Sequence, residues 1–97
     1  MRIDKFLKLS RLVKRRAAAK EMTEVGAVRL NGRAAKPSSV VQSGDSIEVA
    51  YPRRVLSASV LTTDEREIKR GAPCAAVTAE RRLAPDENPW GMEPTVK

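Results

Sequence analysis

The side chains best suited to chemistry in this 97-residue chain are cations, and they gather at its start. Residues 1–36 carry a net charge of +8, whereas residues 37–97 carry −1. The first 20 residues alone contain Arg2, Lys5, Lys8, Arg11, Lys14, Arg15, Arg16 and Lys20. Phosphates repeat along a nucleic-acid strand, so a protein that holds one needs several cations on one surface. Because the planar guanidinium matches phosphate oxygens and stacks on bases, we rank Arg2, Arg15 and Arg16 above Lys8.

A solvated helix face is the ordinary alternative for such a run of charges. A face of that kind usually mixes signs and forms Glu–Lys pairs four residues apart. Here Asp4–Lys8 and Lys20–Glu24 are almost the only candidate pairs. We therefore interpret the cluster as a nucleic-acid-binding surface, within which a single member such as Lys8 can be merely solvated.

Catalytic and metal chemistry find little support in the composition. There is no histidine, which excludes imidazole general-base catalysis, Cys–His nucleophilic pairs and His-ligated metal. The lone Cys74 forms no intrachain disulfide and is more typical of a small buried residue than of a redox centre. Gly26 and Gly32 lack the neighbours of a phosphate-binding loop. We predict a binding module, not an enzyme, that uses no cofactor and no metal.

The chain also lacks the usual signals for export or membrane insertion. Its apolar runs are far shorter than the ~18 residues of a membrane span, and charges occupy the amino terminus where a signal peptide would be apolar. We expect a cytoplasmic protein with no membrane partner, and a single cysteine suits a reducing cytosol. An organelle transit peptide is the rival interpretation of the Arg-rich start, but Asp4, Glu21 and Glu24 count against it.

Two short helices are expected to position the cations. Asp4 is a candidate N-cap for a helix near residues 4–10, with an apolar side made of Ile3, Phe6 and Leu7. A second helix is predicted over residues 15–25, where Ala17–Ala19 give high propensity and Gly26 supplies a stop. Its apolar side would hold Ala18, Met22 and Val25, and its polar side would extend the positive surface of the first helix.

Strands are predicted to follow the helices. Val28 and Leu30 alternate with polar or small residues, and Asn31-Gly32 is a strong tight-turn pair, so a hairpin begins there. Further strands are expected over residues 47–51 and 55–61, then a polar connection with room for a helical turn, then a short edge strand within residues 74–80. The fold class predicted is α+β, with two short amino-terminal helices packed on a small, mostly antiparallel sheet.

The chain is expected to form one small domain with a tail. We assign residues 1–51 to an RNA-binding domain, residues 52–82 to a carboxy-terminal strand extension of that domain, and residues 83–97 to a mobile, acidic, Pro-rich tail. Trp90 lies in that tail. It either anchors a partner or folds back onto the domain, and the pattern does not choose between the two.

About half of the chain, residues 2–49, closely resembles the S-four RNA-binding domain family. The resemblance rests on an ordered composite motif: RIDKFL near the start, SRLVKRR, an Ala-rich second helix, GAVRLNG and a late GD. The family implies two helices against a small sheet, with RNA on the surface of the helices and the adjoining loop. On that basis, together with Arg11 from the basic cluster, the RNA-binding residues are expected to be Arg2, Lys5, Arg11, Lys14, Arg15, Arg16, Lys20, Asn31, Arg33 and Lys36.

Within the family, the chain is most similar to small bacterial ribosome-associated quality-control factors and less closely to their heat-shock relatives. This resemblance implies binding to obstructed large ribosomal subunits, with contacts to large-subunit rRNA and P-site peptidyl-tRNA together. It also implies assistance to carboxy-terminal alanine tailing of stalled nascent chains, with other quality-control factors as further candidate partners. A monomer is the default for a basic domain that docks on a large RNA. Residues 62–97 match the family poorly.

Three other interpretations remain open from the sequence. One is a heat-shock-type recycling factor for large subunits, from the same family. Another is a protein-interaction or DNA-binding adaptor whose helix pair enters the major groove, although the second helix offers few base-reading side chains. The third is a binder of anionic membranes, although the helices lack the bulky apolar face that inserts into lipid.

Overall fold

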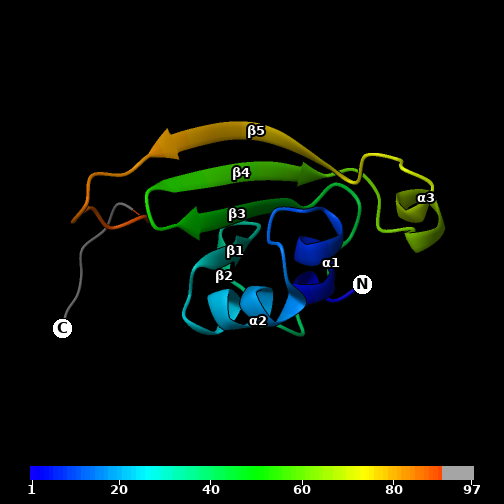
Figure 1. The fold of residues 1–97 in the computed structure, drawn as a ribbon, viewed down its shortest axis with the longest axis horizontal. Coiled ribbons are helices and arrows are strands. Elements are labelled where there is room, and N and C mark those ends of the chain that lie inside the picture. The colour runs from blue at the N-terminus through cyan, green and yellow to red at the C-terminus, as the bar shows by residue number, and fades with distance from the viewer. Residues whose placement is uncertain (91–97) are drawn as a thin grey trace.

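The computed structural model describes residues 1–90, which fold into two helices against one face of a five-stranded antiparallel sheet (Figure 1). The strand order is β2-β1-β3-β4-β5. In chain order the elements are α1 (Ile3–Leu9), α2 (Arg16–Glu24), β1 (Val28–Leu30), β2 (Arg33–Ala34), β3 (Ser46–Tyr51), β4 (Arg54–Val60), α3 (Glu65–Lys69) and β5 (Ala75–Arg82). The predicted α+β fold of two short helices on a small sheet is confirmed.

The core lies between α1, α2 and the sheet. Three residues of α1 are fully buried, and they meet inward-facing residues of β1 and β3. These largest buried side chains include Ile3, Phe6, Leu7, Val28, Ile47 and Val49. The α1 positions follow helical spacing and the β3 positions alternate, so each element presents one apolar side to the same interior. Packing thus fixes α1 rigidly and holds its other side toward solvent.

Two expectations about the helices are wrong. Asp4 is the second residue of α1 and not its cap: Arg2 occupies the N-cap position and makes no side-chain capping bond. Val25 is not on the apolar side of α2, because the helix ends at Glu24 and Val25 is 78% exposed in the C-cap position. A helix that stops one residue early turns its next side chain away from the core.

The predicted hairpin is confirmed, with Asn31 and Gly32 at φ values of 53° and 81°. Both fall in the left-handed region that a tight two-residue turn requires. The Asn31 side chain is itself used in the turn: its Oδ1 accepts from the Ser46 amide at 2.9 Å and its Nδ2 donates to Asp45 at 3.2 Å. The hairpin is therefore tied to the start of β3.

The second half of the sheet is longer than the sequence suggested. β5 runs from Ala75 to Arg82 and pairs with β4 along its whole length, with an irregularity between Ser57 and Ala58. The polar connection between β4 and β5 contains α3, which begins at an Asp64 cap that accepts from the Arg66 amide at 2.9 Å. Figure 1 shows α3 and the β3–β4 turn at opposite ends of the long axis.

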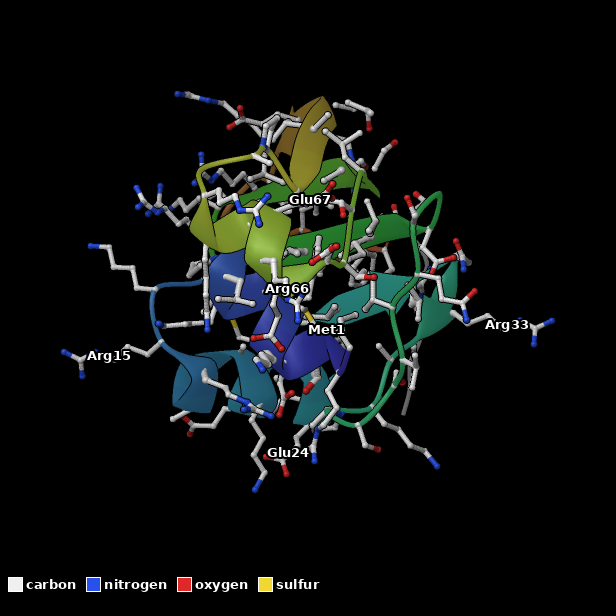
Figure 2. The ribbon with its side chains drawn as sticks, turned by 90° about the vertical axis from the view of Figure 1, so that its right-hand side faces the viewer. Met1, Arg15, Glu24, Arg33, Arg66 and Glu67 are labelled. Carbon is white, nitrogen blue, oxygen red and sulfur yellow. The ribbon has the colours of Figure 1, made fainter. Side chains whose placement is uncertain are left out.

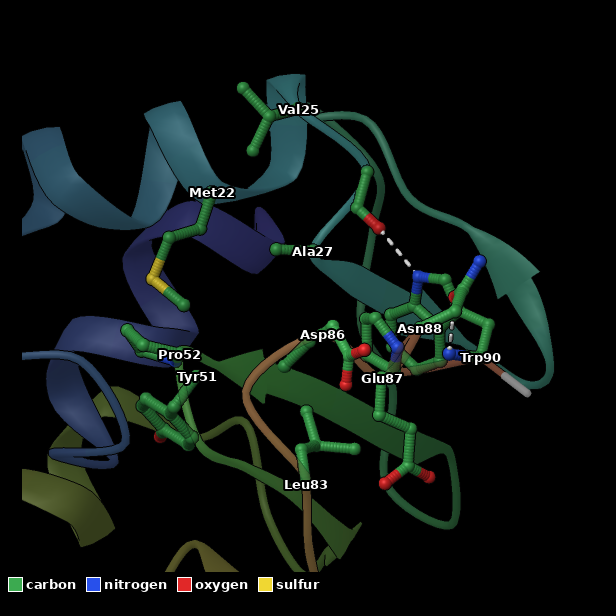
Figure 3. A pocket seen from close by; sticks show the side chains of 13 residues that line it. Met22, Val25, Ala27, Tyr51, Pro52, Leu83, Asp86, Glu87, Asn88 and Trp90 are labelled. Carbon is green, nitrogen blue, oxygen red and sulfur yellow. Dashed lines mark hydrogen bonds between the residues drawn. The ribbon is translucent and has the colours of Figure 1, made fainter. Parts of the chain in front are cut away.

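Residues 83–90, which we call the strap, return toward the β1 end of the sheet. The Leu83 amide donates to the Arg53 carbonyl at 2.9 Å, and Leu83 is buried. The Trp90 indole N–H donates to the Gly26 carbonyl at 3.0 Å (Figure 3). Of the two alternatives for Trp90, the structure shows the fold-back. Residues 91–97 of the expected tail lie outside the described residues, and the domain boundaries stay predictions.

Candidate nucleic-acid interface

A buried carboxylate organises the cations of the two helices. Asp4 is 3% exposed, and its two oxygens lie 3.3 Å from an Arg2 nitrogen and 3.3 Å from an Arg16 nitrogen. Arg2 immediately precedes α1, whereas Arg16 begins α2, so the carboxylate joins the amino-terminal ends of two helices. The fold thus places two arginines side by side that are far apart in the sequence.

The Asp4 carboxylate is fully paired, yet its arginine partners keep N–H donors for other ligands. A buried carboxylate is tolerated only when it is paired and hydrogen-bonded, and Asp4 also accepts from the Lys5 amide at 2.7 Å. Each guanidinium has five N–H donors and gives Asp4 only one contact. Because the Arg2 and Arg16 side chains are about half exposed, their remaining donors face solvent. The two guanidiniums are therefore held in place and still have free N–H donors that suit phosphate oxygens.

Lys5 is held by a partner that the sequence did not indicate. Its Nζ lies 2.5 Å from a carboxylate oxygen of Glu65 on α3. That hydrogen bond is the main reason why the pKa of Glu65 is lowered from its ordinary value. α3 therefore docks on α1 through an ion pair between residues 60 positions apart. Lys5 lies on the expected surface, but its ammonium is shared with α3.

The loop between α1 and α2 carries three cations of the expected set that the described residues leave unpaired. Arg11, Lys14 and Arg15 are exposed and form no ion pair within residues 1–90. Arg11 has φ 65°, an uncommon value for a residue other than glycine. A hollow in the surface is lined by Lys8, Arg11, Val13 and Lys14. The tightly turned loop therefore presents several positive side chains to solvent close together.

An aromatic residue from the sheet fastens this loop. The Tyr51 hydroxyl donates to the Leu12 carbonyl, and burial raises the pKa of that hydroxyl. The Val13 amide donates to the Leu7 carbonyl at 3.1 Å, and Val13 is buried. The loop is thus anchored at both residues that precede Lys14. The sequence indicated only that Tyr51 ends a strand, and that position by itself does not predict a contact with Leu12.

The expected residues do not all share one face. Figure 2 shows Arg15 and Arg33 pointing to opposite sides of the molecule, with the helices between them. Lys20 is exposed on α2, and Arg33 and Lys36 are exposed beyond the hairpin turn. The Asn31 amide is already bonded within the turn. The structure therefore brings together Arg2 and Arg16, places Arg11, Lys14 and Arg15 on the adjoining loop, and leaves Arg33 and Lys36 apart from them.

Other sites have less to offer. Burial raises the pKa of the Cys74 thiol, which is 6% exposed, so at neutral pH it is a poor nucleophile. Within residues 1–90, no group of three or more acidic, histidine or cysteine side chains is placed to hold a metal ion. None of the helices in that range is long and apolar enough to cross a membrane.

Comparison with known proteins gives consistent similarities. The model of the S4 domain matches residues 1–47. The RQC P-site tRNA stabilizing factor of Listeria innocua is 42% identical over 72 residues, covering 74% of this chain and 78% of that protein. The factor of the same name from Bacillus subtilis is 47% identical over 60 residues, covering 62% and 70%. The trimeric structure of heat shock protein 15 from Vibrio cholerae superposes with a TM-score of 0.70 at 28% identity, covering 81% and 82%.

Proposed function

Because the chain belongs to the S4 domain family that includes the RQC P-site tRNA stabilizing factors, we propose that it binds RNA on the large ribosomal subunit and stabilises P-site tRNA there. The observation that carries the proposal is the pair of half-exposed arginines, Arg2 and Arg16, held on one buried carboxylate. Two fixed guanidiniums bind phosphates at a smaller entropic cost than flexible side chains do. The loop cations Arg11, Lys14 and Arg15 extend the same contact.

The finer part of the proposal concerns the assembly. The subunits in question are obstructed by peptidyl-tRNA, and the protein contacts large-subunit rRNA and that tRNA together. By stabilising the tRNA it assists carboxy-terminal alanine tailing of the stalled nascent chain. The role requires binding and positioning only, so the protein acts as a non-enzymatic factor. Because it acts on ribosomal subunits, it acts in the cytoplasm. We propose that it does so as a monomer, with other quality-control factors as neighbours.

The experiment is salt-dependent co-sedimentation with large ribosomal subunits that carry P-site peptidyl-tRNA. The variant Arg2→Gln/Arg16→Gln is expected to bind about a hundredfold more weakly or worse, since it loses two charge-assisted hydrogen bonds that contribute about 1.5–3 kcal/mol each. Arg66→Gln/Arg70→Gln removes the same charge from α3 and its C-cap and is the matched control; it is expected to bind nearly as well as the wild type. Wild-type binding by a folded Arg2→Gln/Arg16→Gln protein would refute the assignment.

A heat-shock-type role in recycling large subunits is the second candidate. It is favoured by the structural similarity to heat shock protein 15, which extends over 81% of this chain and so beyond the S4 domain. The two roles differ in their product. Loss of alanine tails in a strain that lacks the gene supports the first role, whereas intact tails with accumulated free obstructed subunits support the second. Equal affinity for duplex DNA and folded rRNA would instead favour a DNA-binding adaptor.

A further inference from the structure

A second group of arginines lies at the far end of the sheet, outside the S4 domain match. Arg53 and Arg54 form the β3–β4 turn and the start of β4, and Arg82 ends β5. We call these three residues the turn cluster. They line a hollow together with Glu80 and Leu83. In the sequence they belong to a stretch with a net charge near zero, so composition gave no reason to single them out.

The sheet places these charges against one another. Arg54 and Arg82 are directly opposed residues in the β4–β5 ladder, and like charges in that position destabilise a sheet. Arg53 is fixed nearby because its carbonyl accepts from the amide of Leu83, the residue after Arg82. In the described part of the chain, three guanidiniums therefore share one hollow with a single carboxylate. An anion that entered it would relieve the repulsion.

Residues 1–90 neutralise the turn cluster only in part. Glu80 lies 3.3 Å from Arg54, and both side chains are 48% exposed. The side chains of Arg53 and Arg82 make no ion pair within residues 1–90, and both residues are exposed. Arg81, on the other face of the strand, pairs instead with Glu87 at 2.7 Å. Two guanidiniums of the turn cluster are thus available to a ligand.

Tyr51 connects the turn cluster with the α1–α2 loop. The guanidinium carbon of Arg54 lies 4.8 Å from the centre of the Tyr51 ring. The hydroxyl at the other end of that ring donates to the Leu12 carbonyl, two residues before Lys14. One aromatic side chain therefore separates the turn cluster from the loop that carries Lys14 and Arg15. The two positive regions adjoin.

Resting on the proposed function, we propose that Arg53, Arg54 and Arg82 form a second RNA-phosphate site that continues the surface of the α1–α2 loop. The ligand chemistry follows from the residue type: all three cations are arginines, whose planar forks suit phosphate oxygens. The position follows from Tyr51, which aligns Arg54 beside the loop. An RNA strand bound at Arg2 and Arg16 thereby gains contacts on the sheet as well as on the helices.

The test uses the full-length protein and large ribosomal subunits carrying P-site tRNA. Arg53→Gln/Arg82→Gln is expected to bind several-fold more weakly. The negative slope of log K against log salt is expected to become shallower by roughly 1.5, since each lost phosphate contact removes about 0.7–0.9 from its magnitude. Glu80→Gln removes the only carboxylate among residues 1–90 that lines the hollow and is expected to tighten binding several-fold. Circular dichroism confirms that each variant is folded.

Matched controls change the same charge at the opposite end of the long axis. Arg66→Gln/Arg70→Gln and Glu67→Gln are expected to leave affinity within about twofold of the wild type. An unchanged salt slope for Arg53→Gln/Arg82→Gln, or an equal loss in the α3 control, overturns the second site. So does unchanged binding by Glu80→Gln, or competition by polyglutamate as effective as that by RNA. Arg2→Gln/Arg16→Gln is measured in parallel. If this variant binds as well as the wild type, the proposed function is refuted. If it binds weakly while Arg53→Gln/Arg82→Gln binds normally, the second site alone is refuted.

Discussion

Asp4 shows how one residue sets the geometry of a binding surface. It contributes negative charge to a positive region, which on net charge alone weakens attraction for RNA. Yet its buried carboxylate holds Arg2 and Arg16 at 3.3 Å each. The geometry that Asp4 imposes and the charge that it carries therefore have opposite effects on RNA affinity, and a substitution separates the two effects.

The substitution Asp4→Asn raises the net charge by one and keeps the size of the side chain. We expect RNA affinity to fall about three- to tenfold, because both guanidiniums lose the ion that orients them. The free energy of unfolding should fall by about 1–3 kcal/mol, less than for a fully buried pair because the arginines are half exposed. Filter binding and urea titration measure the two effects. Glu24→Gln adds the same charge on the exposed side of α2 and should leave affinity equal or higher; tighter binding by Asp4→Asn would contradict the positioning role.

At the scale of elements, the β1–β2 hairpin illustrates a residue whose expected role and observed contacts differ. Asn31 was predicted to contact RNA, but both ends of its amide are bonded within the protein, to Ser46 and Asp45. Its φ of 53° also suits the turn. The contacts point to a structural role, in which Asn31 sets the register of β1 on β3.

Asn31→Gly and Asn31→Ala separate the backbone from the side chain. Both lose the two side-chain hydrogen bonds, which should lower the free energy of unfolding by about 1–2 kcal/mol. Alanine should lose roughly 1 kcal/mol more, because its Cβ disfavours positive φ. Thermal unfolding measures the difference. RNA affinity of the folded glycine variant should stay within twofold of the wild type, and a larger loss would return Asn31 to the RNA-contact set.

The whole molecule is closed by contacts between its two halves. Trp90 of the strap donates to the Gly26 carbonyl, and the guanidinium carbon of Arg29 on β1 lies 4.3 Å from its ring centre. The strap residues and the end of α2 form an apolar-lined cleft in which Met22 and Tyr51 face Leu83 and Asp86 (Figure 3). The end of the described chain thus covers the β1 side of the domain.

Trp90 is the only tryptophan, so its fluorescence reports on the strap alone. Arg29→Ala should shift the emission to longer wavelength and increase quenching by iodide, because the ring loses its cation–π partner and becomes more exposed. The change should occur without loss of secondary structure. Arg33→Ala removes a neighbouring cation of the hairpin that does not contact the ring and serves as the control. Identical spectra for wild type and Arg29→Ala would show that the strap is not held at this point in solution.

Local patterns in the sequence were enough for the elements and for the kind of ligand. Helical spacing marked Ile3, Phe6 and Leu7, the Asn31-Gly32 pair marked the turn, and the excess charge of residues 1–36 indicated a polyanion. Each of these signals spans a few residues, because helix periodicity, turn conformation and charge density depend on near neighbours.

Only the tertiary structure decided which charges are paired and which are free. Four contacts join residues distant in the chain: the Asp4–Arg16 pair, the Lys5–Glu65 pair, the opposition of Arg54 and Arg82, and the hydrogen bond from Trp90 to Gly26. Such contacts depend on strand register and on how helices dock, and neither is encoded within a short window. For this reason the sequence by itself determined that the protein carries a cationic, helix-borne surface, while the fold determined where that surface begins, bends and ends.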